Sequence, residues 1–246
     1  AFLDVGQGDS IFIEAPNGNQ ILIDGGSGAS VLRKLDAVMP YYDRTIDVVI
    51  ATHPDKDHVG GLVDVLNRFN VSYFVEPGVP GTTGIFLALE NSVTDRGVKK
   101  IIARRGMNID LGDGVVLNIL FPDHDVSRVK NTNDGSIVAR LSYGATSVML
   151  TGDAPQSVEM RLVALGGPSR QGGAEAGKNL QSNILKLGHH GSKTSSNPAF
   201  LGNVSPDYAI ISAGLNNQYG HPHKEVTDLL LKFKIPTLKT YELGTI

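Results

Sequence analysis

The segment Thr52-His53-Pro54-Asp55-Lys56-Asp57-His58-Val59-Gly60-Gly61 places two imidazoles and two carboxylates within six residues. It follows the apolar run 47–51, which predicts a buried strand. Because side chains alternate faces in an extended segment, His53, Asp55 and Asp57 can point the same way, and a turn can add His58 to the same cavity. Nitrogen and oxygen donors without thiolate suit Zn²⁺ or Mn²⁺.

The alternative interpretation of this segment is a solvated polar turn between a strand and a helix. Two observations count against that interpretation. Buried carboxylates without a partner are costly, and Gly60-Gly61 supplies the small residues that are needed where the backbone crowds a site. We therefore interpret residues 53–58 as a metal-binding segment.

The composition limits the classes of protein that the chain can belong to. Of its 246 residues, 41% are hydrophobic, which is enough for a substantial core, and the absence of cysteine excludes disulfides and thiolate metal sites. A net charge of −3 argues against a protein that coats nucleic acid, although it is compatible with a nuclease that holds a short strand at a metal centre. The chain contains no run of about twenty apolar residues, so no transmembrane segment is predicted within it. Ala1 leads directly into the strand-like run 2–5, which predicts a domain cut from a longer chain.

Both halves of the chain begin with β-type runs and continue with alternating strands and helices. We predict strands over 2–5, 10–14, 20–24, 47–51, 73–75, 100–103, 115–120, 137–143, 147–150, 184–187 and 208–212, and helices over 30–39, 62–69, 85–93, 155–165, 198–201 and 225–233. This order predicts an α/β fold in which two mixed sheets lie face to face and helices cover both outer sides.

Further ligand-type side chains follow other predicted strands. Asp153 follows the apolar run 147–150, where it is either a metal ligand or the N-cap of the next helix. Of the adjacent His189 and His190, one is expected to be a ligand and the other structural or in the outer shell. His221 and His223 form a third histidine cluster in the same topological place. Six of the seven histidines thus lie just beyond predicted strand ends, which favours one joint site, with His124 as the exception.

The order of these motifs resembles the metallo-β-lactamase superfamily. The segments Phe2-Leu3-Asp4-Val5-Gly6-Gln7-Gly8-Asp9-Ser10 and Leu22-Ile23-Asp24-Gly25-Gly26 sharpen the resemblance to the soluble C-terminal domain of the ComEC competence proteins, which take up DNA. The resemblance implies a single metallo-β-lactamase-like domain over residues 1–246, folded as a four-layer αββα sandwich. It also implies two divalent metal ions in the cleft between the sheet edges.

Carried onto this chain, the resemblance implies a ligand set for each ion. His53 and Asp55 would hold one ion, Asp57, His58 and His190 the other, and Asp153 would bridge them. Asp55 stands where many members of the superfamily carry histidine, which tilts the preference toward Mn²⁺, with Zn²⁺ as the alternative. A further histidine that many members place before the bridging aspartate has no counterpart here, because residues 131–136 occupy that region.

The function implied by the resemblance is a nuclease that uses two metal ions to cleave single-stranded DNA during natural transformation. Its partner would be the membrane channel of the same longer chain, and its location the extracytoplasmic face of the bacterial membrane. The residues assigned to catalysis are Asp57, His221 and His223, and those assigned to substrate binding are His189, Ser192, Lys193 and Thr194.

Two alternatives of other classes stay open. One is a hydrolase of the same fold with a small substrate, such as a phosphodiester, a lactone or a β-lactam. The other is a metal-binding domain without turnover that docks onto a channel or a DNA-handling partner. For residues 192–194 the alternative to phosphate binding is a polar loop that caps a helix.

Overall fold

The computed structural model describes residues 1–166 and 180–246, and within them the strands form two sheets. The first sheet has the order β1-β2-β3-β4-β5, with β1 (Ile11–Glu14) and β2 (Gln20–Ile23) antiparallel and β2, β3 (Thr45–Ile50), β4 (Asn70–Glu76) and β5 (Lys99–Ile102) parallel. The second sheet has the order β12-β11-β10-β9-β8-β7-β6. Its strands are β6 (Asn108–Gly112), β7 (Val115–Phe121), β8 (Val138–Tyr143), β9 (Thr146–Leu150), β10 (Ile184–Lys186), β11 (Tyr208–Ile211) and β12 (Thr237–Lys239).

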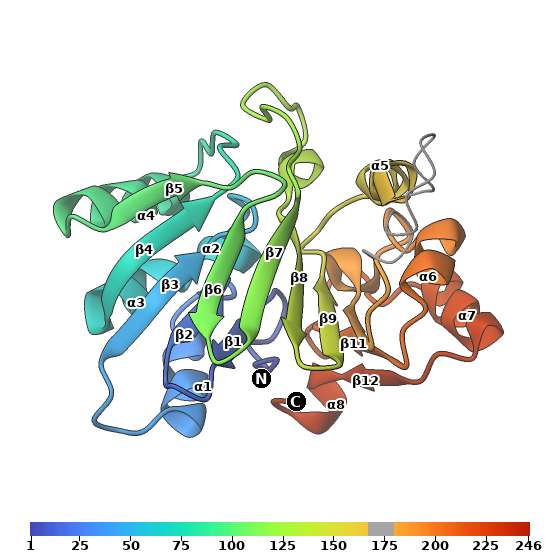
Figure 1. Cartoon of the computed structure of the whole chain (residues 1–246), viewed down its shortest axis with the longest axis horizontal. Helices are drawn as coiled ribbons and strands as arrows, with labels where there is room; N and C mark the ends of the chain where they lie inside the picture. The colour runs from blue at the N-terminus through green and yellow to red at the C-terminus, as the bar shows by residue number, and fades with distance from the viewer. Residues whose placement is uncertain (167–179) are drawn as a thin grey trace.

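The two halves of the chain follow one plan. In each half an antiparallel part comes first, and parallel strands joined by helices follow. Figure 1 shows the two sheets beside each other, with the helices of the first half on one outer side and those of the second half on the other. The helices are α1 (Ser30–Val38), α2 (Lys56–Val59), α3 (Leu62–Arg68), α4 (Gly84–Asp95), η1 (Thr132–Gly135), α5 (Gln156–Gly166), η2 (Gly188–Gly191), α6 (Pro198–Val204), α7 (Lys224–Phe233) and α8 (Thr240–Leu243).

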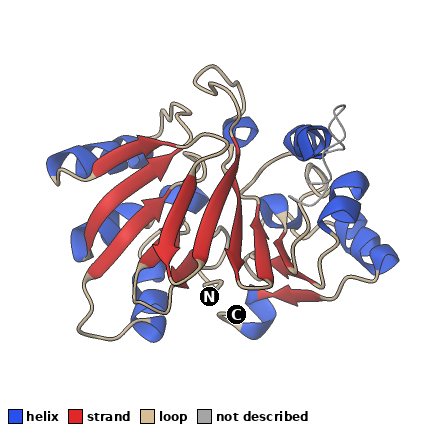
Figure 2. Ribbon diagram, in the orientation of Figure 1, coloured by secondary structure: helices blue, strands red, loops and turns tan. Residues whose placement is uncertain are grey.

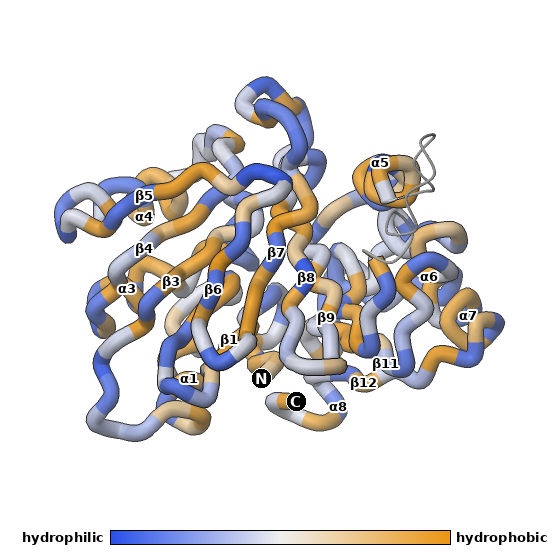
Figure 3. The backbone as a smooth tube through the Cα atoms, viewed as in Figure 1, coloured by the Kyte–Doolittle hydropathy of each residue, from blue (hydrophilic) through white to orange (hydrophobic). Residues whose placement is uncertain are grey.

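Three apolar layers hold the helices and sheets together. Ile21 and Ile23 of β2 belong to the layer between the sheets, whereas Leu22 belongs to the layer under α1, α3 and α4. This alternation is what a strand buried on both faces requires. The third layer lies between the second sheet and α5, α6 and α7, and includes Leu162 and Leu201. Figure 2 shows helices on both outer sides of the strands, and in Figure 3 the strands are largely hydrophobic.

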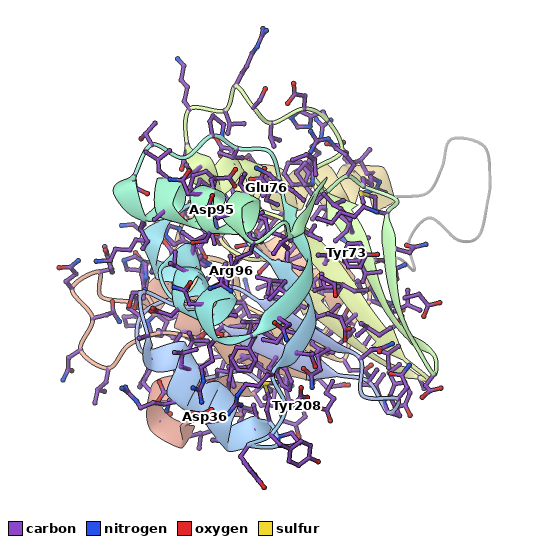
Figure 4. All side chains as sticks on the ribbon, turned by 90° about the vertical axis from the view of Figure 1, so that its left-hand side faces the viewer. Asp36, Tyr73, Glu76, Asp95, Arg96 and Tyr208 are labelled. Atoms are coloured by element: carbon purple, nitrogen blue, oxygen red, sulfur yellow. The ribbon has the colours of Figure 1, made fainter. Side chains whose placement is uncertain are left out.

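The outer surfaces of the helices carry charged side chains together with some exposed apolar ones, such as Leu87 of α4 and Leu231 of α7. In Figure 4, α1, α3 and α4 lie in front of the first sheet, and exposed Asp36 and Asp95 lie on α1 and α4. Both the layers and the mixed sheets are those predicted from the sequence. None of the described helices has the length and apolar character needed to cross a lipid bilayer.

Some predicted elements differ from those observed. The run 2–5 forms only an isolated bridge between Phe2 and Ile11, because the chain turns away from β1 after Leu3, where the Val5 backbone nitrogen donates to the Leu3 carbonyl. Strands β6 and β12 were not predicted, since β6 mixes polar and apolar residues and contains Gly112, while β12 is only three residues long. None of these differences touches the strand ends that carry the ligand-type side chains.

Candidate metal centre

The ligand-type side chains converge where strands of both sheets end. His53 follows β3, and Asp55, Asp57 and His58 lie at or within the short helix α2. Asp153 follows β9, and His190 lies in η2 after β10. His53, His58, Asp153 and His190 are each at most 2% exposed. These loops come from opposite halves of the chain, so the site forms only when the sheets pack together.

Asp153 is the centre of the cluster. Its Oδ1 lies 3.2 Å from His58 Nε2, and its Oδ2 lies 3.5 Å from His190 Nε2 and 3.9 Å from His53 Nε2. The two remaining carboxylates lie on either side. Asp55 Oδ2 is 3.7 Å from His53 Nε2, and Asp57 Oδ2 is 3.4 Å from His190 Nε2. The structure thus brings all six predicted ligands together, with Asp153 between two sets.

Each of the buried imidazoles directs its Nε2 atom toward Asp153. The Nε2 atoms of His53, His58 and His190, and Oδ1 of Asp153, are buried and have no hydrogen-bond partner among the described residues. Buried polar atoms are rarely left without a partner, and imidazole nitrogens and carboxylate oxygens are common ligands of divalent metals. These four atoms therefore fit a metal centre, and the residues present suit the two ions that the resemblance implies.

The opposite nitrogen of each imidazole is held by the protein. His58 Nδ1 donates to Asp24 Oδ2 at 2.7 Å, and His190 Nδ1 donates to the Ser212 carbonyl at 2.9 Å. His53 Nδ1 lies 3.0 Å from Thr52 Oγ1, which itself donates to Asp24 Oδ2 at 2.7 Å. Such bonds fix the tautomer and leave the Nε2 lone pair for a metal.

Asp9 belongs to the outer part of the site. One oxygen each of Asp9 and Asp153 and one nitrogen each of His58 and His190 lie within 4.8 Å of one another, which makes Asp9 a candidate ligand by distance. However, Asp9 faces the Nδ1 atoms of both histidines, at 3.9 and 3.3 Å, whereas Asp153 faces their Nε2 atoms. Asp9 is also paired with the buried ammonium of Lys186. We therefore assign it to orienting the imidazoles.

The pKa values follow from burial and from these partners. Burial and the neighbouring His58 lower the pKa of His53 to about 3, so this imidazole is neutral. Burial alone would lower the pKa of His190, but Asp153 and Asp9 outweigh it and raise the pKa to about 9. Burial is likewise outweighed at His58, where Asp153 and Asp24 raise the pKa well above its usual value. Metal ions must displace these protons, so metal affinity should fall at low pH.

The residues assigned to catalysis and substrate binding lie around this cluster. The ring of His221 lies 5.4 Å from that of His189 and 6.0 Å from that of His190, measured between centroids. His189 is partly exposed, and its Nε2 lies 3.7 Å from Asp153 Oδ2. His223 Nδ1 accepts a hydrogen bond from the Lys193 backbone at 3.1 Å, which gives it a part in holding the loop that follows η2.

The loop after η2 has few free polar groups. Thr194 Oγ1 lies 3.0 Å from His189 Nδ1 and donates to Ser192 Oγ at 3.0 Å. These two hydroxyls therefore position His189. The Lys193 side chain is exposed. Thr194 is exposed as well, but its hydroxyl is paired with Ser192, which leaves the Lys193 ammonium for a substrate.

Several site residues were not predicted. Asp9 and Asp24 lie in segments that contribute only to the family resemblance, and Lys186 lies within the predicted strand 184–187. A signal was present for Lys186, because a lysine within the apolar run 184–187 must find a partner when it is buried. Thr132 was also missed. It donates to Asp55 Oδ1 at 2.7 Å and comes from the region that lacks the further histidine.

Comparison with known proteins identifies the family of the chain. A family model described as the metallo-beta-lactamase superfamily matches residues 3–214. ComE operon protein 3 of Bacillus subtilis (strain 168) is 30% identical over 99% of this chain and 32% of its own length. Competence protein ComA of Neisseria gonorrhoeae is 31% identical over 96% of this chain and 30% of its own length. The chain thus spans about a third of the length of the curated relatives it matches.

A solved structure has a fold similar to that of this chain. Igni18, a metallo hydrolase from the archaeon Ignicoccus hospitalis KIN4/I, superposes with a TM-score of 0.60 over 96% of this chain and 93% of its own, at 14% identity. At that identity the likeness concerns the fold alone. With the family model covering most of its length, and with competence proteins among its relatives, the chain belongs to the metallo-β-lactamase superfamily.

Proposed function

We propose that this protein is a phosphodiesterase that uses two divalent metal ions to cleave single-stranded DNA. The observation that carries the proposal is the position of Asp153 between two sets of ligand-type atoms, with three buried Nε2 atoms directed toward it. A phosphodiester resists hydrolysis because its own charge repels a nucleophile. When bound, a pair of metal ions activates water and offsets the charge that develops on the phosphoryl oxygens.

We assign the ligands to the two ions as the family resemblance implies. His53 and Asp55 would hold one ion, Asp57, His58 and His190 the other, with Asp153 shared. The carboxylate-rich set favours Mn²⁺ over Zn²⁺. Thr132 holds Asp55 in place through its hydrogen bond to Oδ1.

Other residues of the chain act on the substrate and the water. Asp57 is partly exposed, and although burial would raise its pKa, His190 and His58 outweigh that effect and lower it, so Asp57 is ionised and can accept a proton from the attacking water. Burial and the neighbouring His190 lower the pKa of His221 to about 4. His221 is therefore neutral before the substrate binds. An approaching phosphate would raise its pKa and allow it to donate a proton to the leaving oxygen.

The relatives support DNA as the substrate. Two of them are named for the ComE operon and for competence. We therefore propose that the protein acts in DNA uptake together with a membrane channel, at the extracytoplasmic face of the bacterial membrane. Lys193, exposed beside His189, would hold a neighbouring phosphate.

The test is release of nucleotides from end-labelled single-stranded DNA in the presence of Mn²⁺, Zn²⁺ or Mg²⁺. We expect Mn²⁺ to support the fastest cleavage and Asp57→Ala to abolish it. Asp36→Ala, which changes an exposed carboxylate on α1, is the control and should leave cleavage unchanged. Equal cleavage by wild type and Asp57→Ala would refute the proposal. Hydrolysis of nitrocefin or a lactone without DNA cleavage would favour a small-molecule hydrolase instead.

A further inference from the structure

A cavity of about 370 Å³ lies beside the candidate metal centre and has no role in the assignments above. Asp57 forms one wall, so the cavity adjoins the position where the scissile phosphate would lie. The other lining side chains include Gln7, Lys56, Gln218 and Tyr219. Its volume falls within the range of small-molecule binding pockets.

The loop between β11 and α7 shapes one side of the cavity and is held by Asn217. The Asn217 amide donates to the carbonyls of Gly214 and His221 at 2.9 and 2.6 Å. Its Oδ1 accepts from the backbone nitrogens of Tyr219 and His221 at 3.2 and 3.0 Å. One side chain thus makes four hydrogen bonds to its own loop, which fixes the position of Tyr219 before any ligand binds.

Tyr219 presents an aromatic surface to solvent beside the site. Its ring stacks on that of His221, with the centroids 5.6 Å apart and the planes at 21°. The residue is 53% exposed, so part of its surface remains open to a ligand. Because His221 lies next to His189 and His190, the stacked rings lead from the metal centre to the cavity.

Polar groups in the cavity are available for a ligand. Gln7 Oε1 accepts from the Gly214 backbone at 3.1 Å, whereas Gln7 Nε2 is buried without a hydrogen-bond partner among the described residues. The Lys56 side chain is exposed, and within residues 1–166 and 180–246 no carboxylate forms an ion pair with it. The cavity therefore offers an aromatic face, an amide donor and a cation.

We propose that this cavity binds an unpaired nucleobase of the strand being cleaved, stacked on Tyr219, with Lys56 at a neighbouring phosphate. The inference rests on the proposed function and specifies its substrate. Aromatic rings bind bases of any sequence by stacking, and amides can hydrogen-bond base edges.

This arrangement would select single strands. In a duplex the faces of each base are covered by its neighbours and its edge is paired, so a base could enter the cavity only after being pulled out of the stack. A single strand meets no such cost. The Tyr219 cavity would thus supply the strand preference, while the metal centre supplies the chemistry.

The experiment measures binding of fluorescent phosphorothioate-linked strands, which resist cleavage, to the metal-loaded protein by anisotropy. One strand is a short oligothymidylate, and the other has the same length and charge but abasic sugars. We expect wild type to bind oligothymidylate more tightly. Tyr219→Ala should weaken that binding roughly tenfold or more and leave binding of the abasic strand unchanged. Tyr219→Phe should bind as wild type, because the ring is retained.

Controls separate stacking from general effects. Tyr143→Ala removes a tyrosine of similar exposure, 52%, on β8 and should change neither affinity. Lys56→Ala should weaken both strands alike, because it removes a phosphate contact. Circular dichroism of each variant verifies that the fold is intact.

Three results would overturn the inference: equal affinity of wild type for the two strands, unchanged oligothymidylate binding in Tyr219→Ala, or loss of binding in Tyr219→Phe. The outcome is independent of cleavage. Base-dependent binding through Tyr219 without cleavage by wild type would refute the proposed nuclease and leave the base cavity standing. Cleavage by wild type together with equal binding of both strands would refute the base cavity and leave the proposed nuclease standing.

Discussion

Replacing Lys186 by methionine should destabilise the protein strongly. Lys186 is fully buried in β10, where its ammonium pairs with Asp9 and donates to the Gly152 carbonyl at 3.1 Å. Burial alone would raise the pKa of Asp9, but Lys186 and then His190 outweigh it, and the pKa lies below its usual value. Methionine preserves the length of the side chain and removes the charge, so Asp9 would remain buried without its principal cation.

The size of the effect follows from the burial of both partners. Removing one member of a buried ion pair costs about 3–5 kcal/mol, and a lost hydrogen bond adds about 1 kcal/mol. We therefore expect the free energy of unfolding to fall by roughly 4–6 kcal/mol. Urea denaturation in EDTA, followed by circular dichroism, measures it without a contribution from bound metal.

A double-variant cycle isolates the pair. Asp9→Asn should also destabilise the protein, because it leaves the Lys186 ammonium buried without its counter-ion. The combined variant should lose less stability than the sum of the single variants, with a coupling energy of at least about 2 kcal/mol. Lys224→Met is the control. It breaks the exposed pair with Asp228 on α7, where 82% of the Lys224 side chain is in solvent, and should cost less than about 1 kcal/mol.

Two outcomes would refute this reasoning. One is a Lys186→Met variant within about 1 kcal/mol of wild type, and the other is additivity of the two single variants. If Lys186→Met cannot be obtained folded, the double variant decides. Its recovery as folded protein would support the pair, and failure to recover it would count against the expected compensation.

Three further predictions concern the metal, the pH dependence and the backbone. Asp55→His should raise the ratio of bound Zn²⁺ to bound Mn²⁺ roughly tenfold, because imidazole is a softer ligand than carboxylate; elemental analysis after dialysis against both ions measures it. Burial raises the pKa of Glu159 to about 7 from an ordinary 4.5, so the stability linked to its proton is complete below about pH 4.5 and is lost as the pH rises through about 7. Glu159→Gln should therefore gain up to about 3 kcal/mol relative to wild type between those pH values in urea denaturation. Gly8→Ala should cost roughly 2–4 kcal/mol, because a Cβ there would lie 2.0 Å from the Asp57 carbonyl oxygen, and the φ of +118° at Gly8 is one that L side chains rarely adopt.

A specific result would contradict each of these three predictions. An unchanged metal ratio in Asp55→His would mean that this residue does not set the preference. Parallel stability curves for wild type and Glu159→Gln across the pH range would mean that Glu159 titrates normally. For the backbone, Gly18→Ala is the control, since Gly18 also has a positive φ, +88°, but nothing within 4 Å of an added Cβ. Equal losses in Gly8→Ala and Gly18→Ala would show that the contact with Asp57 is unimportant.

The layer arrangement could be predicted because it depends on local patterns. Runs such as 147–150 and 208–211 are apolar and short, and each is followed by a helix or a turn. The edge strands carry a weaker pattern. Lys99–Ile102 ends in two adjacent isoleucines and was predicted, whereas Asn108–Gly112 mixes polar and apolar residues, contains a glycine and was not predicted.

The inner part of the site was predictable for a similar reason, since His53, Asp153 and His190 all follow predicted strands. The outer part was not. Asp9 and Lys186 are far apart along the chain and meet only when the sheets pack, so their spacing in the sequence does not indicate that they form an ion pair. The Nδ1 partners of the histidines, Asp24 and the Ser212 carbonyl, depend on the same tertiary contacts.

The division of the ligand-type side chains between the two halves of the chain has a mechanical consequence. An ion held by His58 on one side and by His190 on the other would be a non-covalent cross-link between the sheets. Once free metal exceeds its dissociation constant, each tenfold increase should add about 1.4 kcal/mol to the free energy of unfolding. Metal starvation would then loosen the sandwich at the same time as it stops the chemistry, so that resistance to proteolysis becomes a direct reporter of metal supply.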